Sequence, residues 1–154
     1  MSVNVGDKAP DYSMQGDLGP ISPDGLSGKV VVLYFYPKDD TTGCTAEGQA
    51  FTATAKDFAA AGAVVIGVSK DTVSKHAKFR AKYGLEPMLG SDPDGTVIEA
   101  YGVWVEKVLY GRQYMGIERA TFLIDADGIV QQIWRKVKVA GHAAAVLAAV
   151  RALA

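Results

Sequence analysis

Cys44 is the only cysteine of this 154-residue chain, and it lies among hydroxyl-bearing and charged residues rather than on an apolar face. A thiolate is a strong nucleophile, but an unperturbed thiol, with a pKa near 8.5, is only about 3% ionised at neutral pH. Thr41 precedes Cys44 by three residues and Glu47 follows it by three. Cys44 is therefore either a reactive nucleophile or a buried structural cysteine, the ordinary role of a lone thiol.

Other arrangements that could do chemistry receive less support. His76 and His142 lie in predicted helices far from Cys44 in the sequence, which disfavours a Cys–His hydrolase or a metal pair. A single cysteine excludes an internal disulfide and a four-cysteine zinc site. Residues 38–40 are predicted to be a solvated loop without a role. We therefore expect neither a metal nor a bound cofactor.

The elements that must position Cys44 are a strand and the helix that follows it. Val30–Tyr36 is an unbroken run of β-branched and aromatic residues, which predicts a strand buried on both faces, and Pro37 ends it. An Ala-rich segment from Thr45 to Ala61 predicts a helix, so that Cys44 falls at or near its first turn. Unpaired backbone N–H groups and the helix dipole favour an anion there. The position supports a reactive thiolate, although the structural role stays open.

The remaining pattern alternates strands and helices. Residues 1–28 predict a small hairpin ahead of the main sheet. Strands are predicted at Ala63–Ser69, Pro87–Ser91, Arg119–Asp125 and Ile129–Lys136. Helices are predicted from an N-cap within 71–74 up to Gly84, from the turn at 92–95 through Tyr101, and over 140–154. Residues 102–118 are aromatic and weakly patterned, and we interpret them as a loop region at the site. A parallel beginning and an antiparallel ending predict an α/β fold with helices on both faces of a mixed sheet.

The segment before Cys44 resembles one family closely. Pro37, Thr41 and Cys44 reproduce the active-site signature of the peroxiredoxins, and the wider stretch Tyr34–Thr41 is similar to the bacterioferritin-comigratory, or peroxiredoxin Q, branch. The resemblance covers nearly the whole chain. It continues through residues 101–104, 114–117 and 119–125.

This resemblance implies a role for each residue. Cys44 would be the peroxidatic nucleophile, with Thr41, Arg119 and Pro37 completing the catalytic site and Glu47 organising hydrogen bonds around the arginine. From the residues alone, Arg119 could instead be a surface residue at a strand edge and Pro37 only a strand terminator. Thr41 could be a turn residue or N-cap, and Glu47 a solvated glutamate of the first helical turn.

Two departures from the branch stand out. Many members carry proline where this chain has Thr42, and many carry a resolving cysteine where it has Gln49. The resemblance therefore implies a one-Cys enzyme that reduces hydrogen peroxide and organic hydroperoxides through a Cys44 sulfenic acid. An external thiol, from thioredoxin, glutaredoxin or glutathione, would resolve that intermediate, unless a second subunit does so through an intermolecular disulfide.

The resemblance further implies a single thioredoxin-like domain over residues 1–154, acting as an antioxidant oxidoreductase in cell redox homeostasis. A net charge of −1 and a pI near 6.1 disfavour nucleic acid or an anionic membrane as a partner. No segment approaches the roughly 18 apolar residues of a membrane span, and the first residues lack a signal-peptide core. We expect a cytoplasmic protein that is a monomer or weak dimer.

A rival hypothesis is a non-enzymatic thioredoxin-fold module, either a redox sensor or a holdase chaperone. An apolar collar could serve either function or simply fill a loop. It comprises Trp104, Val105, Leu109, Tyr110, Tyr114 and Met115. Continued consumption of peroxide with a thiol reductant would distinguish the enzyme from a sensor, which reacts once per chain.

Overall fold

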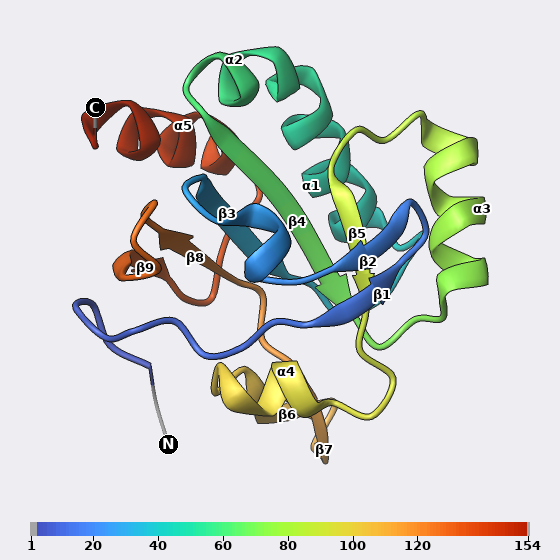
Figure 1. Ribbon diagram of the computed structural model, residues 1–154. Coiled ribbons are helices and arrows are strands. Elements are labelled where there is room, and N and C mark those ends of the chain that lie inside the picture. The colour runs from blue at the N-terminus through green and yellow to red at the C-terminus, as the bar shows by residue number, and fades with distance from the viewer. Residues whose placement is uncertain (1–2, 154) are drawn as a thin grey trace.

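The structure, a computed structural model, describes residues 3–153 and is built around a seven-stranded mixed sheet (Figure 1). The strand order is β2-β1-β5-β4-β3-β8-β9. These strands are β1 (Met14–Gly16), β2 (Gly19–Ile21), β3 (Val30–Phe35), β4 (Ala63–Ser69), β5 (Met88–Ser91), β8 (Ala120–Ile124) and β9 (Val130–Trp134). The helices are η1 (Asp24–Leu26, a 3-10 turn), α1 (Thr42–Ala53), α2 (Ala55–Ala60), α3 (Val73–Tyr83), α4 (Thr96–Ala100) and α5 (His142–Ala152). None of these helices is both long and apolar enough to cross a membrane.

Strand β3 lies inside the sheet because it is apolar on both faces. Val31, Leu33 and Phe35 point into one hydrophobic cluster, whereas Val32 and Tyr34 point into the other. This alternation is the two-residue period of a strand whose faces are both covered. The prediction of a strand buried on both sides is confirmed.

Strand directions change across the sheet as the sequence predicted. β3 pairs parallel with β4, which pairs parallel with β5. β8 is antiparallel to both β3 and β9, and β1 and β2 form the expected N-terminal hairpin. The thioredoxin-like α/β class is therefore confirmed, with predicted element ends that differ by only a few residues.

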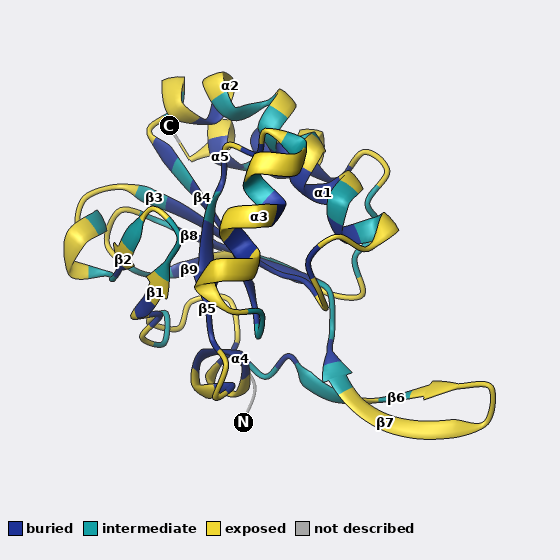
Figure 2. Cartoon of the chain, turned by 90° about the vertical axis from the view of Figure 1, so that its right-hand side faces the viewer, coloured by how far each residue is buried: buried dark blue, intermediate teal, exposed yellow. Residues whose placement is uncertain are grey.

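Helices cover both faces of the sheet, unequally. Phe51 of α1, Phe58 of α2, Phe79 of α3 and Val146 of α5 all lie in the cluster on one face. The other face is covered by α4, through Ile98, and by the N-terminal segment. Figure 2 shows the buried strands between these two layers.

The predicted helix from Thr45 to Ala61 is two helices. α1 begins earlier, at Thr42, and ends at Ala53, and α2 follows after Thr54. The Thr54 hydroxyl donates to the Ala50 carbonyl, so the side chain competes for a backbone acceptor where the helix ends. The correction leaves Cys44 inside the first turn of α1.

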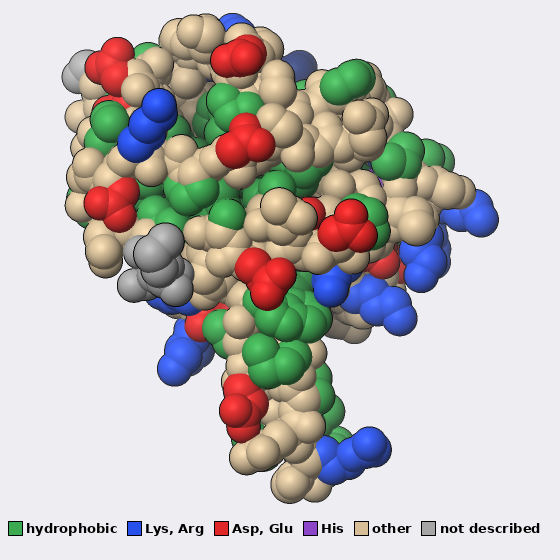
Figure 3. All heavy atoms as spheres, turned by 60° about the horizontal axis from the view of Figure 1, so that its bottom comes forward, with side chains coloured by type: hydrophobic (Ala, Val, Ile, Leu, Met, Phe, Trp, Pro, Cys, Tyr) green, Lys and Arg blue, Asp and Glu red, His purple; other side chains and the backbone are tan. Residues whose placement is uncertain are grey.

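The prediction of a loop over residues 102–118 is wrong. This segment forms a hairpin of β6 (Trp104–Leu109) and β7 (Arg112–Ile117). Tyr110 and Gly111 both have positive φ, of 50° and 75°, as in the type I′ turns that join two antiparallel strands. The hairpin projects from the body of the molecule (Figures 2 and 3). An arm exposed on both sides has no buried face to impose alternation, which is why its sequence is weakly patterned.

The apolar collar proposed for the rival hypothesis belongs to this arm. Trp104 is half-buried at its base, under the ammonium of Lys70, whereas Tyr110 at the tip is 95% exposed. These residues therefore lie along a projecting hairpin and do not form a ring around Cys44.

Candidate active site

Cys44 is the third residue of α1 and is only 2% exposed. Its side chain belongs to the cluster that contains Tyr34 and Phe51, whose rings stack with centroids 4.7 Å apart. The thiol therefore lies between an apolar floor and the positive end of a helix. Burial alone is consistent with a structural cysteine, so the neighbouring charges decide between the two roles.

The Arg119 guanidinium contacts the thiol. Its Nη2 lies 3.5 Å from Cys44 Sγ, and its side chain comes from the short connection between β7 and β8. Burial works to lower the pKa of Arg119, but the charges and hydrogen bonds of Glu47 and Cys44 together outweigh this effect, and the pKa is raised. Arg119 is thus a fixed positive charge beside the sulfur. The alternative of a surface arginine is wrong.

Glu47 holds the other side of the guanidinium. Arg119 Nη1 donates to Glu47 Oε1 at 2.7 Å, and the Glu47 side chain is 1% exposed. Burial raises the pKa of Glu47 to about 7, even though the charge of Arg119 acts in the opposite direction. Its second oxygen, Oε2, has no hydrogen-bond partner within residues 3–153. The interpretation of Glu47 as a solvated residue is therefore also wrong.

Gly43 provides space for this arrangement. A Cβ at this position would lie 3.0 Å from Arg119 Nη2, closer than most real Cβ contacts. The absent side chain lets the guanidinium approach the first turn of α1 next to Cys44. The sequence did not single out Gly43, because its importance depends on a residue far away in the chain.

Thr41 occupies the N-cap position of α1, but its hydroxyl does not cap the helix. Oγ1 instead donates to the Lys38 carbonyl at 2.9 Å, while the Thr41 carbonyl accepts the first intrahelical bond from Thr45. The N–H groups of residues 42–44 therefore face the site without a side-chain cap. Such groups bind anions and partial negative charge.

Pro37 is the last residue of the predicted site, and Gln49 stands where many relatives carry a resolving cysteine. Pro37 is exposed in the loop between β3 and α1, and Gln49 is exposed on α1. Arg119 contacts both Cys44 and Glu47 directly. Thr41 lies next to this group because it is the N-cap residue of the helix whose first turn contains Cys44. Pro37 is linked to them only by sharing the loop.

Two residues near this site were missed by sequence reasoning. Asp39, interpreted as solvated, is 8% exposed and pairs with buried His76 at 2.7 Å. A signal was present, because Asp39 and Asp71 each follow adjacent parallel strands, whose carboxyl ends meet at one edge of a sheet. Lys107 of β6 is half-buried, and its pKa is lowered by burial and by the charge of Arg119. It was missed because its strand was predicted to be a loop.

No group of three or more His, Cys, Asp or Glu side chains within the described range 3–153 is arranged to hold a metal ion. The described site is instead a thiol held between a guanidinium and uncapped helical N–H groups. It can hold a thiolate and bind a small polar molecule next to it.

Comparison with known proteins gives consistent matches over nearly the full length. Residues 5–133 match the AhpC/TSA family. A relative from Bacillus subtilis, Peroxiredoxin Bcp, is 47% identical over 148 residues, covering 96% of this chain and 94% of that protein.

Solved structures of similar proteins agree with these sequence matches. The bacterioferritin comigratory protein of Xanthomonas campestris, studied for alkyl peroxide reduction, matches with a TM-score of 0.89 and 45% identity, covering 98% of this chain and 97% of the other. A cysteine-to-serine mutant of Xylella fastidiosa PrxQ matches with a TM-score of 0.93 and 36% identity, covering 99% and 98%. Xanthomonas campestris Peroxiredoxin Q has been solved with either of two cysteines replaced by serine, whereas this chain has one cysteine.

Proposed function

Because this chain belongs to the AhpC/TSA family and is a peroxiredoxin of the Bcp type, we propose that Cys44 is the nucleophile of its thiol-dependent peroxidase activity. The substrates are hydrogen peroxide and organic hydroperoxides. The observation that carries this proposal is the 3.5 Å contact between Arg119 Nη2 and Cys44 Sγ at the start of α1. A cation and a helix N-terminus together favour the thiolate over the thiol.

The reaction is a two-electron transfer from sulfur to peroxide. The thiolate attacks the hydroxyl-bearing oxygen of the peroxide, the S–O bond forms and the O–O bond breaks. Sulfur is oxidised to sulfenic acid, and the leaving oxygen takes a proton from solvent to become water or an alcohol. Arg119 and the N–H groups of residues 42–44 stabilise the negative charge that moves onto the leaving oxygen.

The remaining residues bind and shape the substrate site. The Thr41 hydroxyl already gives its proton to the Lys38 carbonyl, so the role left to Oγ1 is to accept a hydrogen bond from the peroxide. Glu47 fixes the guanidinium from behind, at 2.7 Å. We assign Pro37 to the wall of the site, where it shields the sulfenate from further oxidation.

Resolution of the intermediate requires another molecule, because this chain has no second cysteine. A thiolate of glutathione, glutaredoxin or thioredoxin attacks the sulfenic sulfur, the S–O bond breaks, and a mixed disulfide forms while the leaving hydroxide takes a proton from solvent to become water. A second thiol then releases Cys44. A reducing compartment supplies such thiols, which supports cytoplasmic location and a role in cell redox homeostasis.

A single domain and a monomer or weak dimer remain predictions. The matches to Bcp peroxiredoxins support the enzyme and give no support to the non-enzymatic sensor or chaperone.

Intact mass spectrometry tests the proposal. After one equivalent of peroxide we expect a species one oxygen heavier, which glutathione converts into a single mixed disulfide, and continued peroxide consumption with excess thiol. Cys44→Ser, nearly isosteric but not ionised, is the control that should form neither product. Stoichiometric loss of one peroxide per chain would instead indicate a sensor. Covalent dimers through Cys44 would show that a second subunit resolves the intermediate.

A further inference from the structure

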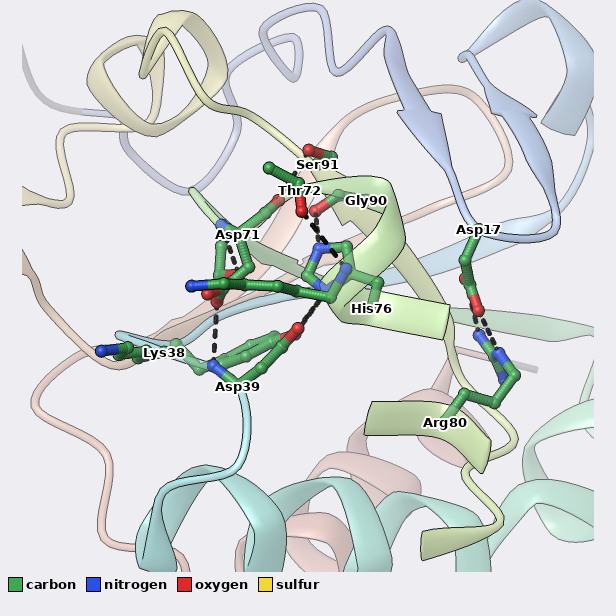
Figure 4. A network of polar contacts seen from close by, with 12 residues as sticks. Asp17, Lys38, Asp39, Asp71, Thr72, His76, Arg80, Gly90 and Ser91 are labelled. Carbon is green, nitrogen blue, oxygen red and sulfur yellow. Dashed lines mark hydrogen bonds and ion pairs between the residues drawn. The ribbon is translucent and has the colours of Figure 1, made fainter. Parts of the chain in front are cut away.

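A buried polar network lies behind the loop that carries Pro37 and Thr41 (Figure 4). His76 of α3 is fully buried, with Nδ1 2.7 Å from Asp39 Oδ2 and Nε2 3.0 Å from the Gly90 carbonyl oxygen. The Tyr36 hydroxyl donates to the other Asp39 oxygen at 2.6 Å. The network therefore ties the β3–α1 loop to α3 and β5.

The partners of His76 fix the number of protons on its ring. A backbone carbonyl only accepts, so Nε2 must carry a proton to bond with Gly90. Nδ1 faces a carboxylate that also only accepts when ionised, so a second proton must lie between Nδ1 and Asp39. Although burial works to lower the pKa of His76, its bonds to Asp39 and Gly90 raise it, which favours that proton on the imidazole. The geometry and this shift together point to a buried imidazolium–carboxylate pair.

The carboxylate member of this pair belongs to the loop, which other contacts also hold. Asp39 lies between Pro37 and Thr41, and its N–H donates to Asp71 Oδ2 at 2.8 Å. The next residue, Asp40, has a positive φ of 60° and is held by contacts with α3. A non-glycine residue in this conformation is strained and persists only when its surroundings hold it.

We propose that His76 is a positioning residue for peroxide reduction: its buried imidazolium holds Asp39 and thereby fixes the loop that carries Pro37 and Thr41 to the start of α1. This inference rests on the proposed function of Cys44 but concerns a residue outside the reacting groups. When Nδ1 loses its proton, its lone pair faces the Asp39 carboxylate at 2.7 Å, and the loop is released.

The surrounding charges favour the protonated ring. Tyr36 and Asp39 face it from the β3–α1 segment and Asp71 from the β4–α3 connection, whereas β5 contributes the Gly90 carbonyl. Burial works to lower the pKa of His76, but the bonds to Asp39 and Gly90 and the negative charges outweigh it, and the pKa is raised. The positioning effect is therefore complete below the ordinary histidine pKa of about 6.5 and is lost as pH rises through the raised pKa of His76.

Nuclear magnetic resonance of the imidazole nitrogens tests the protonation state without using activity. We expect both nitrogens of His76 to be protonated at pH 6 in the reduced wild-type protein, and the ring to lose its proton only above the ordinary histidine pKa of about 6.5. A ring that is neutral at pH 6 would overturn the proposal. This result does not depend on whether Cys44 reacts with peroxide, so it separates failure of this inference from failure of the proposed function.

Stopped-flow oxidation of Cys44 across pH tests the positioning role. The wild-type rate should fall on the alkaline side, although the thiolate fraction does not. In Asp39→Asn, the side-chain amide can donate to neutral Nδ1 of His76 and its oxygen can still accept from Tyr36. We therefore expect this variant to keep most of the wild-type oxidation rate and to show no fall in that rate at alkaline pH. His76→Leu leaves Asp39 Oδ2 without its imidazolium partner, although Tyr36 still donates to Oδ1, and the rate should fall at least about tenfold at pH 6.

Lys78→Gln, an exposed change on the same helix, should keep the wild-type profile and serves as the control. An alkaline fall that persists in Asp39→Asn would assign it to another group and overturn the proposal. Circular dichroism checks the fold of each variant. If His76→Leu does not fold, the pH–rate profile of Asp39→Asn and the nuclear magnetic resonance measurement still test the proposal.

Discussion

Arg119 Nη2 lies 3.5 Å from Cys44 Sγ although 75 positions separate the two residues in the chain. The contact exists because β8 pairs with β3, the strand that precedes the Cys44 loop. Arg119 stands immediately before β8, so sheet pairing carries the guanidinium to the start of α1.

Replacing Arg119 should therefore slow the attack on peroxide. We expect Arg119→Met to slow oxidation of Cys44 on the order of 10- to 100-fold, since a hydrogen bond to a charged group contributes about 1.5–3 kcal/mol. Arg119→Lys should fall between this variant and the wild type, because it keeps the charge but loses the fork that also reaches Glu47. Stopped-flow tryptophan fluorescence gives the rates, and absorbance at pH 7 gives the thiolate fraction. An unchanged thiolate fraction in Arg119→Met would show that the guanidinium does not stabilise the anion.

Glu47 should make stability depend on pH in an unusual direction. Its folded pKa of about 7 exceeds the ordinary value of 4.5, so the folded state binds the proton more tightly. Its contribution to stability therefore falls as pH rises from 4.5 to 7 and is constant above that range. Glu47→Gln removes this dependence. The free energy of unfolding of the variant relative to wild type should thus be higher at pH 8 than at pH 5, by up to about 3 kcal/mol.

Urea unfolding at the two pH values measures this difference. Glu86→Gln, at an exposed position, provides the matched control and should show no such difference. If Glu47→Gln and wild type change in parallel between pH 5 and pH 8, burial does not raise the pKa of Glu47.

Gly43→Ala should separate stability from activity. The added methyl would lie 3.0 Å from Arg119 Nη2 and push the guanidinium away from the sulfur. We expect oxidation of Cys44 to slow by roughly tenfold, since small displacements of an oriented group are costly. The thermal midpoint should not fall in proportion, because alanine favours the helix by up to about 1 kcal/mol over glycine. Gln49→Ala, an exposed change in the same helix, should leave the rate unchanged; a wild-type rate in Gly43→Ala would disprove the steric requirement.

Thr41 should act through its hydroxyl rather than through charge. Thr41→Val removes the acceptor offered to the peroxide, so oxidation should slow by about five- to tenfold, which corresponds to the loss of one ordinary hydrogen bond to the substrate. The bond to the Lys38 carbonyl is lost as well. Thr41→Ser keeps the hydroxyl and should remain close to wild type. Thiol titration should be nearly the same in all three proteins. Equal rates for the valine and serine variants would remove Thr41 from the site.

Much of the fold is determined locally and could be predicted from the sequence. The unbroken apolar run of β3, the turn residues between β8 and β9, and Gly84 after α3 each act through neighbours in the chain. The motif of Pro37, Thr41 and Cys44 is likewise contiguous, so the candidate nucleophile and the helix that carries it could be predicted without coordinates. The β6–β7 arm was missed because its exposed strands carry no buried face, and therefore no alternation, that a sequence could display.

Tertiary structure alone decided which charges surround the thiol. From the residues alone, Glu47 could be a solvated side chain, and only the family resemblance placed it near the arginine; Asp39 was predicted to lie in a solvated loop. Both are buried against partners from other elements: Arg119 beside β8, and His76 in α3. A buried carboxylate is tolerated only when a cation or hydrogen-bond donor meets it. Whether such a partner arrives is settled by the pairing of strands and the packing of helices, because these bring together residues whose separation in the chain carries no local signal.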